Sequence, residues 1–256
     1  MENKYCNDLI SVIIPVFNAA KYLEKTLRSV LTQTAGRFEV VLADDCSTDD
    51  SAEIIHRFQT ENPDIFIYHR QEKNMGAAVA RNTALEIAKG RYVAFLDSDD
   101  VWKPEKTEKQ LLLMKEKDAA FSFTAIEMID ANGALKKEKR KVKEKVDYKF
   151  LLHNTMIPTS SVIIDRSKKG EFKMPLRRSG QDYATWLQLL RDGTVAYGIN
   201  EALVQYRVSG NSLSSNKFKS IKQVWEIQTQ DEKINKFSAF FHVIAFAFNA
   251  LKKHLF

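Results

Sequence analysis

Residues 90–100 read Gly-Arg-Tyr-Val-Ala-Phe-Leu-Asp-Ser-Asp-Asp, an apolar strand pattern that ends in a cluster of carboxylates. Asp97 and Asp99 are two residues apart, and side chains at that spacing on an extended backbone point to the same side. Such oxygen ligands suit Mg²⁺ or Mn²⁺, which commonly keep positions open for phosphate and water. A solvated acidic turn is the alternative, but clustered carboxylates repel one another unless a cation offsets their charge.

Similar strand patterns recur upstream, and a helical pattern follows each of them. Apolar segments predict strands at 10–16, 38–43, 65–69 and 91–96. Periodic apolar residues and an alanine-rich segment predict helices at 19–32, 50–60 and 77–89. Strict alternation favours an α/β fold with a doubly wound, mostly parallel sheet, which we place at about residues 8–125.

Polar residues also follow the neighbouring strands. Asp44 and Asp45 come directly after the second strand, and Asn74 and Gly76 lie between the third strand and its helix. In an open α/β sheet these positions share the carboxyl edge of the strands, where such folds bind ligands. Three separate segments, counting the acids of 97–100, therefore deliver polar groups to one rim.

Two residues near this rim each have two interpretations. Asp45 is either an acceptor for a base edge or ribose hydroxyl, or part of a turn that caps the next helix. Arg81 either points at a diphosphate or lies on the protein surface.

Motifs of other enzyme classes are absent from the sequence. The first strand is followed by Phe17-Asn-Ala-Ala20, without the glycines of a dinucleotide fingerprint. No GxxxxGK[ST] loop, HExxH pair or nucleophile elbow occurs. Neither an NAD enzyme nor a P-loop nucleotide hydrolase is supported.

The charge of +6 is concentrated in one segment, because residues 136–145 contain seven basic and two acidic residues. A local basic patch indicates a docking surface for an anionic partner, whereas a nucleic-acid-binding protein would be basic more widely. Cys6 and Cys46 fit neither a disulfide framework nor a metal site, and the N-terminal residues do not resemble a secretory signal. We therefore expect a reducing, cytoplasmic location.

The second half of the sequence is less regular. Residues 120–129 and those after Gly133 predict an antiparallel pair joined at Asn132-Gly133. Further strands are predicted at 160–164 and 203–208, with a helix at about 181–191 between them. No repeat or Pro/Gly linker interrupts this part, so we predict one domain over residues 1–236.

Together, these motifs resemble those of the family 2 glycosyltransferases, whose fold is called GT-A. The matching segments are Ser11–Asn18, Asp44-Asp45 with Ser47 and Asp49, Asn74–Gly76, Ala80–Asn82, and residues 90–100. The match is strong over about residues 10–110 and returns around 181–189 and 206–212. It implies a nucleotide-sugar-binding half at about 8–125 and a smaller, mixed acceptor half at 126–215.

The resemblance implies how a nucleotide-diphosphate sugar is held. Pro15 and Phe17 would border the base, Asp45 would bind it, and Asp97 would bind the ribose.

Further implied roles concern the reaction. Asp99 would hold Mn²⁺ or Mg²⁺ on the diphosphate, with Arg81 near the nucleotide. Asp182 would be the general base for the acceptor hydroxyl, and the sugar's anomeric configuration would be inverted. A cation that neutralises the departing diphosphate and a positioned carboxylate are the two groups that such a displacement needs.

Asp182 also has a structural interpretation, because Ser179 and Asp182 have the spacing of a capping box. The sequence departs from the family pattern at two positions nearby. Gln181 stands where an acidic residue is common, and Ser209 stands where a histidine is common. A histidine ligand is therefore not expected, and water would complete the metal's coordination.

The C-terminal segment 237–256 is predicted to be an amphipathic helix. Its apolar part, 237–251, is shorter than the roughly 20 residues needed to span a bilayer. Its polar residues, Ser238, His242, Asn249 and Lys253, fall along one side. We expect this helix, together with the basic patch, to reach an anionic inner membrane surface; a helix folded onto the enzyme or a homodimer contact is the alternative.

The predicted function is transfer of a hexosyl or N-acetylhexosaminyl group, with a UDP-sugar favoured as donor, to a glycan or lipid-linked acceptor in cell-surface polysaccharide synthesis. A nucleotidyltransferase is one alternative, although its glycine- and basic-rich loop after the first strand is absent. A sugar-nucleotide-binding subunit without catalysis is another. No nucleic-acid partner is expected.

Overall fold

The first part of the chain alternates between strands and helices, as predicted. The computed structural model describes residues 4–208 and 217–255. In chain order its first elements are β1 (Cys6–Val16), α1 (Ala20–Leu31), β2 (Arg37–Asp44), α2 (Ser51–Glu61), β3 (Phe66–Arg70), α3 (Ala77–Ile87) and β4 (Gly90–Phe95). β1 pairs in parallel with β2 and β4, and β2 pairs in parallel with β3.

The second part mixes short and long elements. They are β5 (Val101–Trp102), α4 (Lys106–Glu116), β6 (Phe121–Ile129), β7 (Leu135–Arg140), β8 (Lys145–Val146), α5 (Tyr148–Leu152), the 3₁₀ turn η1 (Thr159–Ser161), β9 (Ile163–Asp165), α6 (Arg166–Lys169), α7 (Gln181–Leu190) and β10 (Ala196–Arg207). The predicted antiparallel pair around Gly133 is formed by β6 and β7. The strand predicted at 160–164 is shorter than expected, because η1 occupies its first residues.

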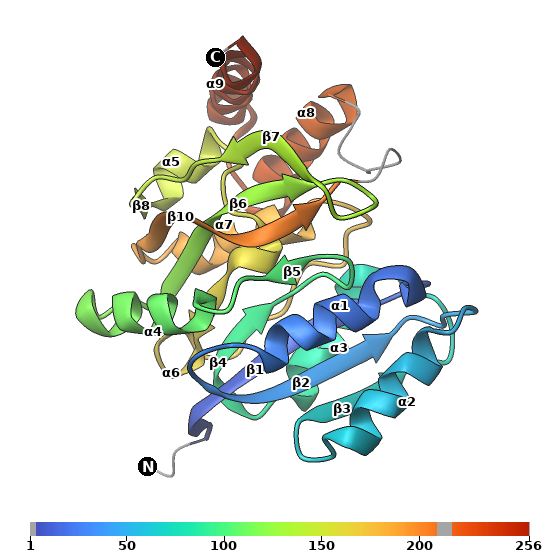
Figure 1. Cartoon of the computed structure of the whole chain (residues 1–256). Coiled ribbons are helices and arrows are strands. Elements are labelled where there is room, and N and C mark those ends of the chain that lie inside the picture. Colours follow the sequence, from blue (N-terminus) through green and yellow to red (C-terminus); the bar gives the residue numbers. More distant parts are fainter. Residues whose placement is uncertain (1–3, 209–216, 256) are drawn as a thin grey trace.

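All these strands belong to one sheet, whose main path runs β3-β2-β1-β4-β9-β6-β10-β5 (Figure 1). β9 is antiparallel to both of its neighbours, β4 and β6, and β10 is parallel to β6. The six longer strands of the path therefore run in one direction. Their carboxyl ends form a single rim that crosses both halves of the chain.

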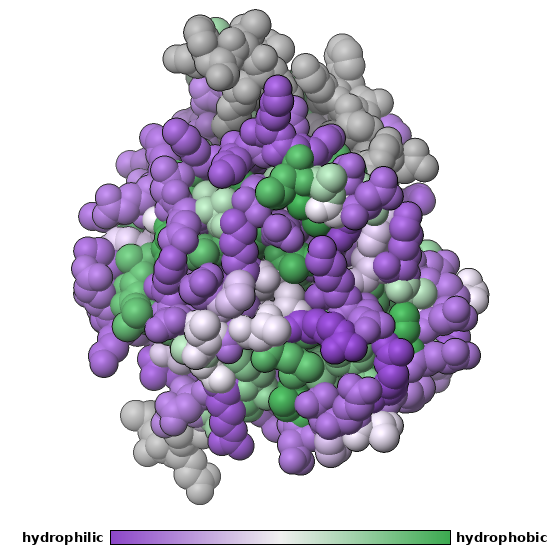
Figure 2. All heavy atoms as spheres, in the orientation of Figure 1, coloured by the Kyte–Doolittle hydropathy of each residue, from purple (hydrophilic) through white to green (hydrophobic). Residues whose placement is uncertain are grey.

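Helices cover both faces of the sheet, which explains the continuous apolar segments in the strands. Ile10, Val12 and Ile14 of β1 pack on the side of α1, α2 and α4, whereas Ile13 packs on the side of α3, α5 and α7. All four are fully buried. In Figure 1, α1 and α2 lie in front of the sheet and α3 behind it, and Figure 2 shows that hydrophilic residues cover most of this front surface.

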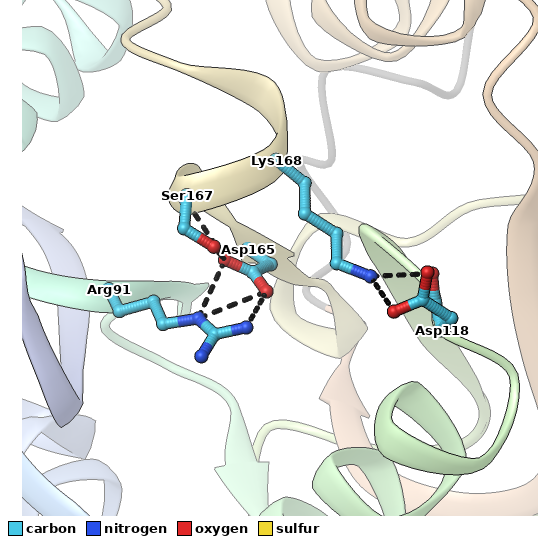
Figure 3. Close-up of polar contacts among 5 residues, drawn as sticks. All are labelled: Arg91, Asp118, Asp165, Ser167 and Lys168. Atoms are coloured by element: carbon cyan, nitrogen blue, oxygen red, sulfur yellow. Dashed lines mark hydrogen bonds and ion pairs between the residues drawn. The ribbon is translucent and has the colours of Figure 1, made fainter.

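Ion pairs hold β9 and α6 against the rest of the sheet (Figure 3). Arg91 of β4 forms an ion pair with the buried Asp165 of β9, with 2.6 Å between nitrogen and oxygen. Asp165 also accepts a hydrogen bond from the backbone N–H of Ser167 and so caps α6. Lys168 of α6 reaches Asp118, in the turn before β6. These contacts fix β9 and α6, the two elements that follow η1, against β4 and the turn before β6.

Two helices end the chain after β10. α8 (Lys217–Glu226) continues into the single π-helical turn η2 (Ile227–Asp231), and α9 (Lys236–Leu255) follows. α8 is an element that we did not predict, although Ile221, Val224 and Trp225 have helical spacing. Within the described ranges, 4–208 and 217–255, every helix is too short or too polar to cross a membrane.

Candidate active site

The rim turn that follows β4 is built from backbone contacts to neighbouring segments. The N–H of Leu96 donates to the carbonyl of Ile13 in β1, and the N–H of Asp97 donates to the hydroxyl of Ser160 at 3.0 Å. The N–H of Asp100 then donates back to the carbonyl of Asp97. The chain therefore turns sharply at the sheet edge and gathers three carboxyl groups there.

Asp100 has a structural position within this turn. Its side chain is fully buried and accepts hydrogen bonds from the Ser160 hydroxyl at 2.6 Å and the backbone N–H of Arg207 at 2.8 Å. Burial, and then the charges of Asp97 and Asp99, raise its pKa well above the ordinary range. Asp100 thus joins the end of β4 to η1 and β10.

A bound cation would stabilise the ionised form of Asp99. Burial and the adjacent charge of Asp97 raise the pKa of Asp99 to about 6. Its ionised form is therefore stabilised by a positive charge at this rim. Outside the undescribed segment 209–216, no group of three histidine, cysteine or acidic side chains is placed to hold a metal. Asp99 could hold a Mg²⁺ or Mn²⁺ ion whose remaining ligands would be phosphate oxygens and water.

Arg81 lies at the rim rather than on the protein surface. Its side chain is only 7% exposed, and its guanidinium lies 2.5 Å from a carboxylate oxygen of Asp97. The Nε atom of Arg81 is buried without a partner among the described residues. The interpretation of Arg81 as a surface residue is therefore wrong, and a buried cation stands beside the acids.

Asp45 holds the segment that leads into α3. Its two carboxylate oxygens accept hydrogen bonds from the backbone N–H groups of Met75 and Gly76, each at 2.7 Å. It does not cap α2, whose N-cap is Asp50. Gly76 has a φ of +90° at the start of α3, a conformation that favours glycine. Asp45 thereby fixes the helix that carries Arg81.

Pro15 and Phe17 border the same rim at the end of β1. The ring of Phe17 is 51% exposed, although the residues on either side of it are held in place. The N–H of Asn18 donates to the Ser47 hydroxyl, and the Asn18 side-chain oxygen accepts from the N–H of Thr48. An exposed, positioned aromatic ring next to the turn after β2 is suited to contact a nucleotide base.

Asp182 comes to this rim from the second half of the chain. It lies in the first turn of α7 and accepts a hydrogen bond from the Thr159 hydroxyl at 3.1 Å. The N-cap of α7 is Gly180, and no side chain caps the helix. The capping-box interpretation of Asp182 is therefore wrong. Its partner Thr159 immediately precedes Ser160, which contacts both Asp97 and Asp100.

The η1 turn is the part of the site that sequence reasoning missed. Thr159 and Ser160 connect Asp182 to the acids, and the indole N–H of Trp102 donates to the carbonyl of Ser160 at 2.7 Å. The only signal was the polar run Thr-Ser-Ser after Pro158, in a segment that we predicted to be a strand. Ser209, which replaces the family's histidine, lies outside the described residues.

A cavity of about 630 Å³ lies beside the site, between α3, residues 173–176 and α7. Asn82, Lys173 and Gln188 are among its lining residues, and none of the predicted site residues is. The α3 residues that line it, Val79, Asn82, Thr83 and Glu86, lie on the opposite side of that helix from Arg81.

The sheet order and the acidic rim define a glycosyltransferase of the GT-A type. The model of the family described as glycosyl transferase family 2 matches residues 11–171, so the chain belongs to that family. TuaG of Bacillus subtilis (strain 168), named as a glycosyltransferase of teichuronic acid biosynthesis, is 44% identical over 247 residues, which are 96% of this chain and 98% of TuaG.

Two further proteins show the extent of the similarity. The Escherichia coli enzyme WfgD, a UDP-Glc:alpha-D-GlcNAc-diphosphoundecaprenol beta-1,3-glucosyltransferase, is 34% identical over 250 residues, which are 97% of this chain and 96% of WfgD. The crystal structure of S. aureus TarS 1–349 with UDP-GlcNAc superposes with a TM-score of 0.71 at 22% identity, covering 93% of this chain and 71% of that one. The structural match bears on the fold, and the sequence matches bear on the class of enzyme.

Proposed function

We propose that this glycosyltransferase moves a sugar from a UDP-sugar to a hydroxyl of a lipid-linked or glycan acceptor during cell-surface polysaccharide synthesis, with inversion at the anomeric carbon. The names of TuaG and WfgD support the biological setting and the lipid-linked acceptor. The UDP-GlcNAc complex of TarS supports the donor class.

One observation carries this proposal: Arg81, Asp97 and Asp99 lie close together at one rim. Phe17 would contact the base, and Asp97 would accept from the ribose. Oδ1 of Asp45 accepts from both Met75 and Gln71, whereas Oδ2 accepts from Gly76 and keeps a lone pair that can accept from a base edge. The donor's phosphates would then lie over the acids.

Asp99 would hold Mn²⁺ or Mg²⁺ on the diphosphate. When bound, the ion supplies positive charge to the departing diphosphate. Arg81 supplies a second, fixed positive charge from the chain itself, because its ion pair with Asp97 directs it at the rim. Charge that is positioned in advance stabilises a leaving group without reorganisation at the moment of reaction.

Asp182 is the proposed general base. The hydrogen bond from Thr159 orients one of its carboxylate oxygens and leaves the other available for an acceptor hydroxyl. Asp182 lies on α7, apart from the residues proposed to contact the nucleotide. This position suits proton removal from an attacking acceptor hydroxyl. Proton removal by a positioned carboxylate contributes about 10²- to 10⁴-fold to such a step.

A donor-binding experiment tests this function. Thermal melting and donor hydrolysis would be measured with UDP-Glc, UDP-GlcNAc and GDP-mannose, each with Mn²⁺ or with EDTA. We expect one UDP-sugar to protect the protein only when metal is present, by about 2.7 kcal/mol at a hundred times Kd. If the donor protected the protein equally well in EDTA, the metal-dependent scheme would be contradicted.

The same experiment distinguishes a binding subunit without catalysis. Gln181 precedes Asp182 where an acid is common in the family, and its side-chain oxygen is buried without a partner among the described residues. Protection by the donor without hydrolysis, and without transfer to a lipid-linked acceptor, would favour that alternative over the proposed reaction.

A further inference from the structure

The C-terminal helix α9 is oriented with its polar side toward the protein. The ring of His242 packs edge-on against His153 at the end of α5, with 4.8 Å between ring centroids. The side-chain amide of Asn249 donates to the backbone carbonyl of His153 at 3.2 Å. Ala239 and Phe246, close to this side of the helix, are buried. His242 and Asn249, two of the polar residues that the sequence places along one side, therefore attach α9 to the enzyme, as in the alternative of a helix folded onto it.

The opposite side of α9 exposes large apolar side chains. We call this set the aromatic stripe: Phe237 is 75% exposed, Phe240 and Phe241 53%, Ile244 50% and Phe248 66%. Their spacing places them along one side over about three helical turns. Phe241 contacts the rings of both Phe237 and Phe240, so much of the stripe is one continuous surface. Exposed apolar surface of this kind marks an interaction site.

The charges around the stripe are basic. Among the residues whose side chains are described, α9 has Lys236 and no acid, and α8 has Lys219 and Lys222 with one acid, Glu226. The two acids just before α9, Asp231 and Glu232, form ion pairs with arginines. The exposed basic strand β7 lies toward the same end of the molecule as α8 and α9 (Figure 1). This distribution is complementary to an anionic surface.

The size of the stripe favours a membrane over a second copy of the chain. At these exposures its side chains present on the order of 500 Å². A stable interface between two proteins buries about 800 Å² on each partner. Aromatic side chains on one side of a helix, flanked by lysines, are typical of a helix that lies in the headgroup region of a bilayer.

We propose that the aromatic stripe of α9 docks the enzyme on an anionic lipid bilayer. This surface is connected to the acceptor side of the site. The hydroxyl of Ser179, which precedes α7, donates to the side-chain oxygen of Gln223 on α8 at 3.0 Å, and α8 packs against α9. Docking would therefore bring the end of α7 that carries Asp182 near the headgroup layer.

Vesicle binding by the full chain tests the proposal. Flotation would be measured with phosphatidylcholine vesicles and with vesicles that also contain phosphatidylglycerol, in the absence of any sugar donor, so that the result is independent of transfer activity. We expect the native chain to float with the anionic vesicles, and added salt to weaken binding. The double variant Phe240→Glu with Phe241→Glu should bind at least about tenfold more weakly.

A matched control and a second measurement make the outcome decisive. Leu112→Glu replaces another exposed apolar side chain, 61% exposed on α4, and should bind like the native chain. Phe248→Glu, far from the other two substitutions, should also weaken binding. Sedimentation without lipid would report self-association. Failure of the native chain to float, equal flotation of the double variant, or a dimer that the double variant abolishes would overturn the proposal.

Discussion

The guanidinium of Arg81 on α3 lies 2.5 Å from a carboxylate oxygen of Asp97, which follows β4. This pair ties the middle of α3 to the turn at the far end of the strand that follows it, β4. We expect Arg81→Met to destabilise the protein, because Asp97 would lose its ion-pair partner while the charge of Asp99 remains nearby. Asp97→Asn in the same background should recover part of the loss. Urea unfolding of both single variants and the double variant would give a coupling energy of about 0.5–3 kcal/mol, and additive effects would show that the pair does not interact.

Asp99→Asn should separate activity from stability. The substitution removes a carboxylate whose pKa is raised to about 6 by burial and by Asp97, so the folded protein should lose no thermal stability. Donor hydrolysis in Mn²⁺ should fall by about 10²-fold or more. EDTA should lower the native enzyme to a similar level and leave the variant unchanged. A variant that retains metal-stimulated hydrolysis would exclude Asp99 as the ligand.

Asp182→Asn should affect transfer without affecting donor binding. Asparagine still accepts the hydrogen bond from Thr159 but takes no proton from the acceptor. We expect the rate of transfer to fall by about 10²- to 10⁴-fold while protection by the donor is unchanged. Asp192→Asn, which replaces an exposed acid after the other end of α7, is the control and should retain the native rate. Full transfer activity in Asp182→Asn would rule out its role as the base.

Gly180→Ala should loosen the contact between α7 and α8. Gly180 has a φ of +72°, and an added Cβ would lie 1.6 Å from the side-chain nitrogen of Gln223. The conformation itself costs about 1–2 kcal/mol for alanine, and displacement of Gln223 breaks its hydrogen bond with Ser179. Gln223→Ala in the same chain should reduce the cost of Gly180→Ala by about 1 kcal/mol. Thermal unfolding of the native protein, the two single variants and the double variant would measure this difference. If Gly180→Ala costs the same with and without the Gln223 side chain, the contact between these positions is contradicted.

The attachment of α9 should depend on pH. Burial, and then the charge of His153, lower the pKa of His242, because both disfavour the imidazolium form in the attached helix. A free histidine titrates near 6.5, so the attachment is fully stable above that pH and weakens as the pH falls below it. The melting temperature should therefore drop between about pH 7.5 and about pH 5.5. His242→Gln should flatten this dependence, whereas His69→Gln, at an exposed position on β3, should leave it unchanged.

The rim could be predicted from sequence because its acids follow strands directly. Asp97 and Asp99 come after an apolar segment, and the alternation of elements placed Asp45 on the same edge. The role of Asp45 could not be predicted in full, because the N–H groups that it binds belong to Met75 and Gly76, about thirty residues away. A local pattern does not show which distant backbone groups a carboxylate will meet.

The η1 turn shows the same limit. Its residues resemble a strand locally, yet the indole of Trp102 and the backbone N–H of Asp97 hold Ser160 in a tight turn. For α9, the periodicity of the polar residues predicted one polar side, but periodicity does not show what that side will contact. His242 and Asn249 find partners at His153, so the polar side faces inward and the apolar side faces outward.

The position of β9 between β4 and β6 has a consequence for how such enzymes diverge. The early and late parts of the chain interlock: β9, from the later part, pairs with β4, and the backbone N–H of Arg207 at the end of β10 donates to Asp100. Neither part can be replaced as a unit without disrupting strand pairing in the other. Changes confined to the connecting loops, by contrast, leave the pairing of β4, β9 and β6 intact, so the loops are where side chains can vary at least cost to the fold.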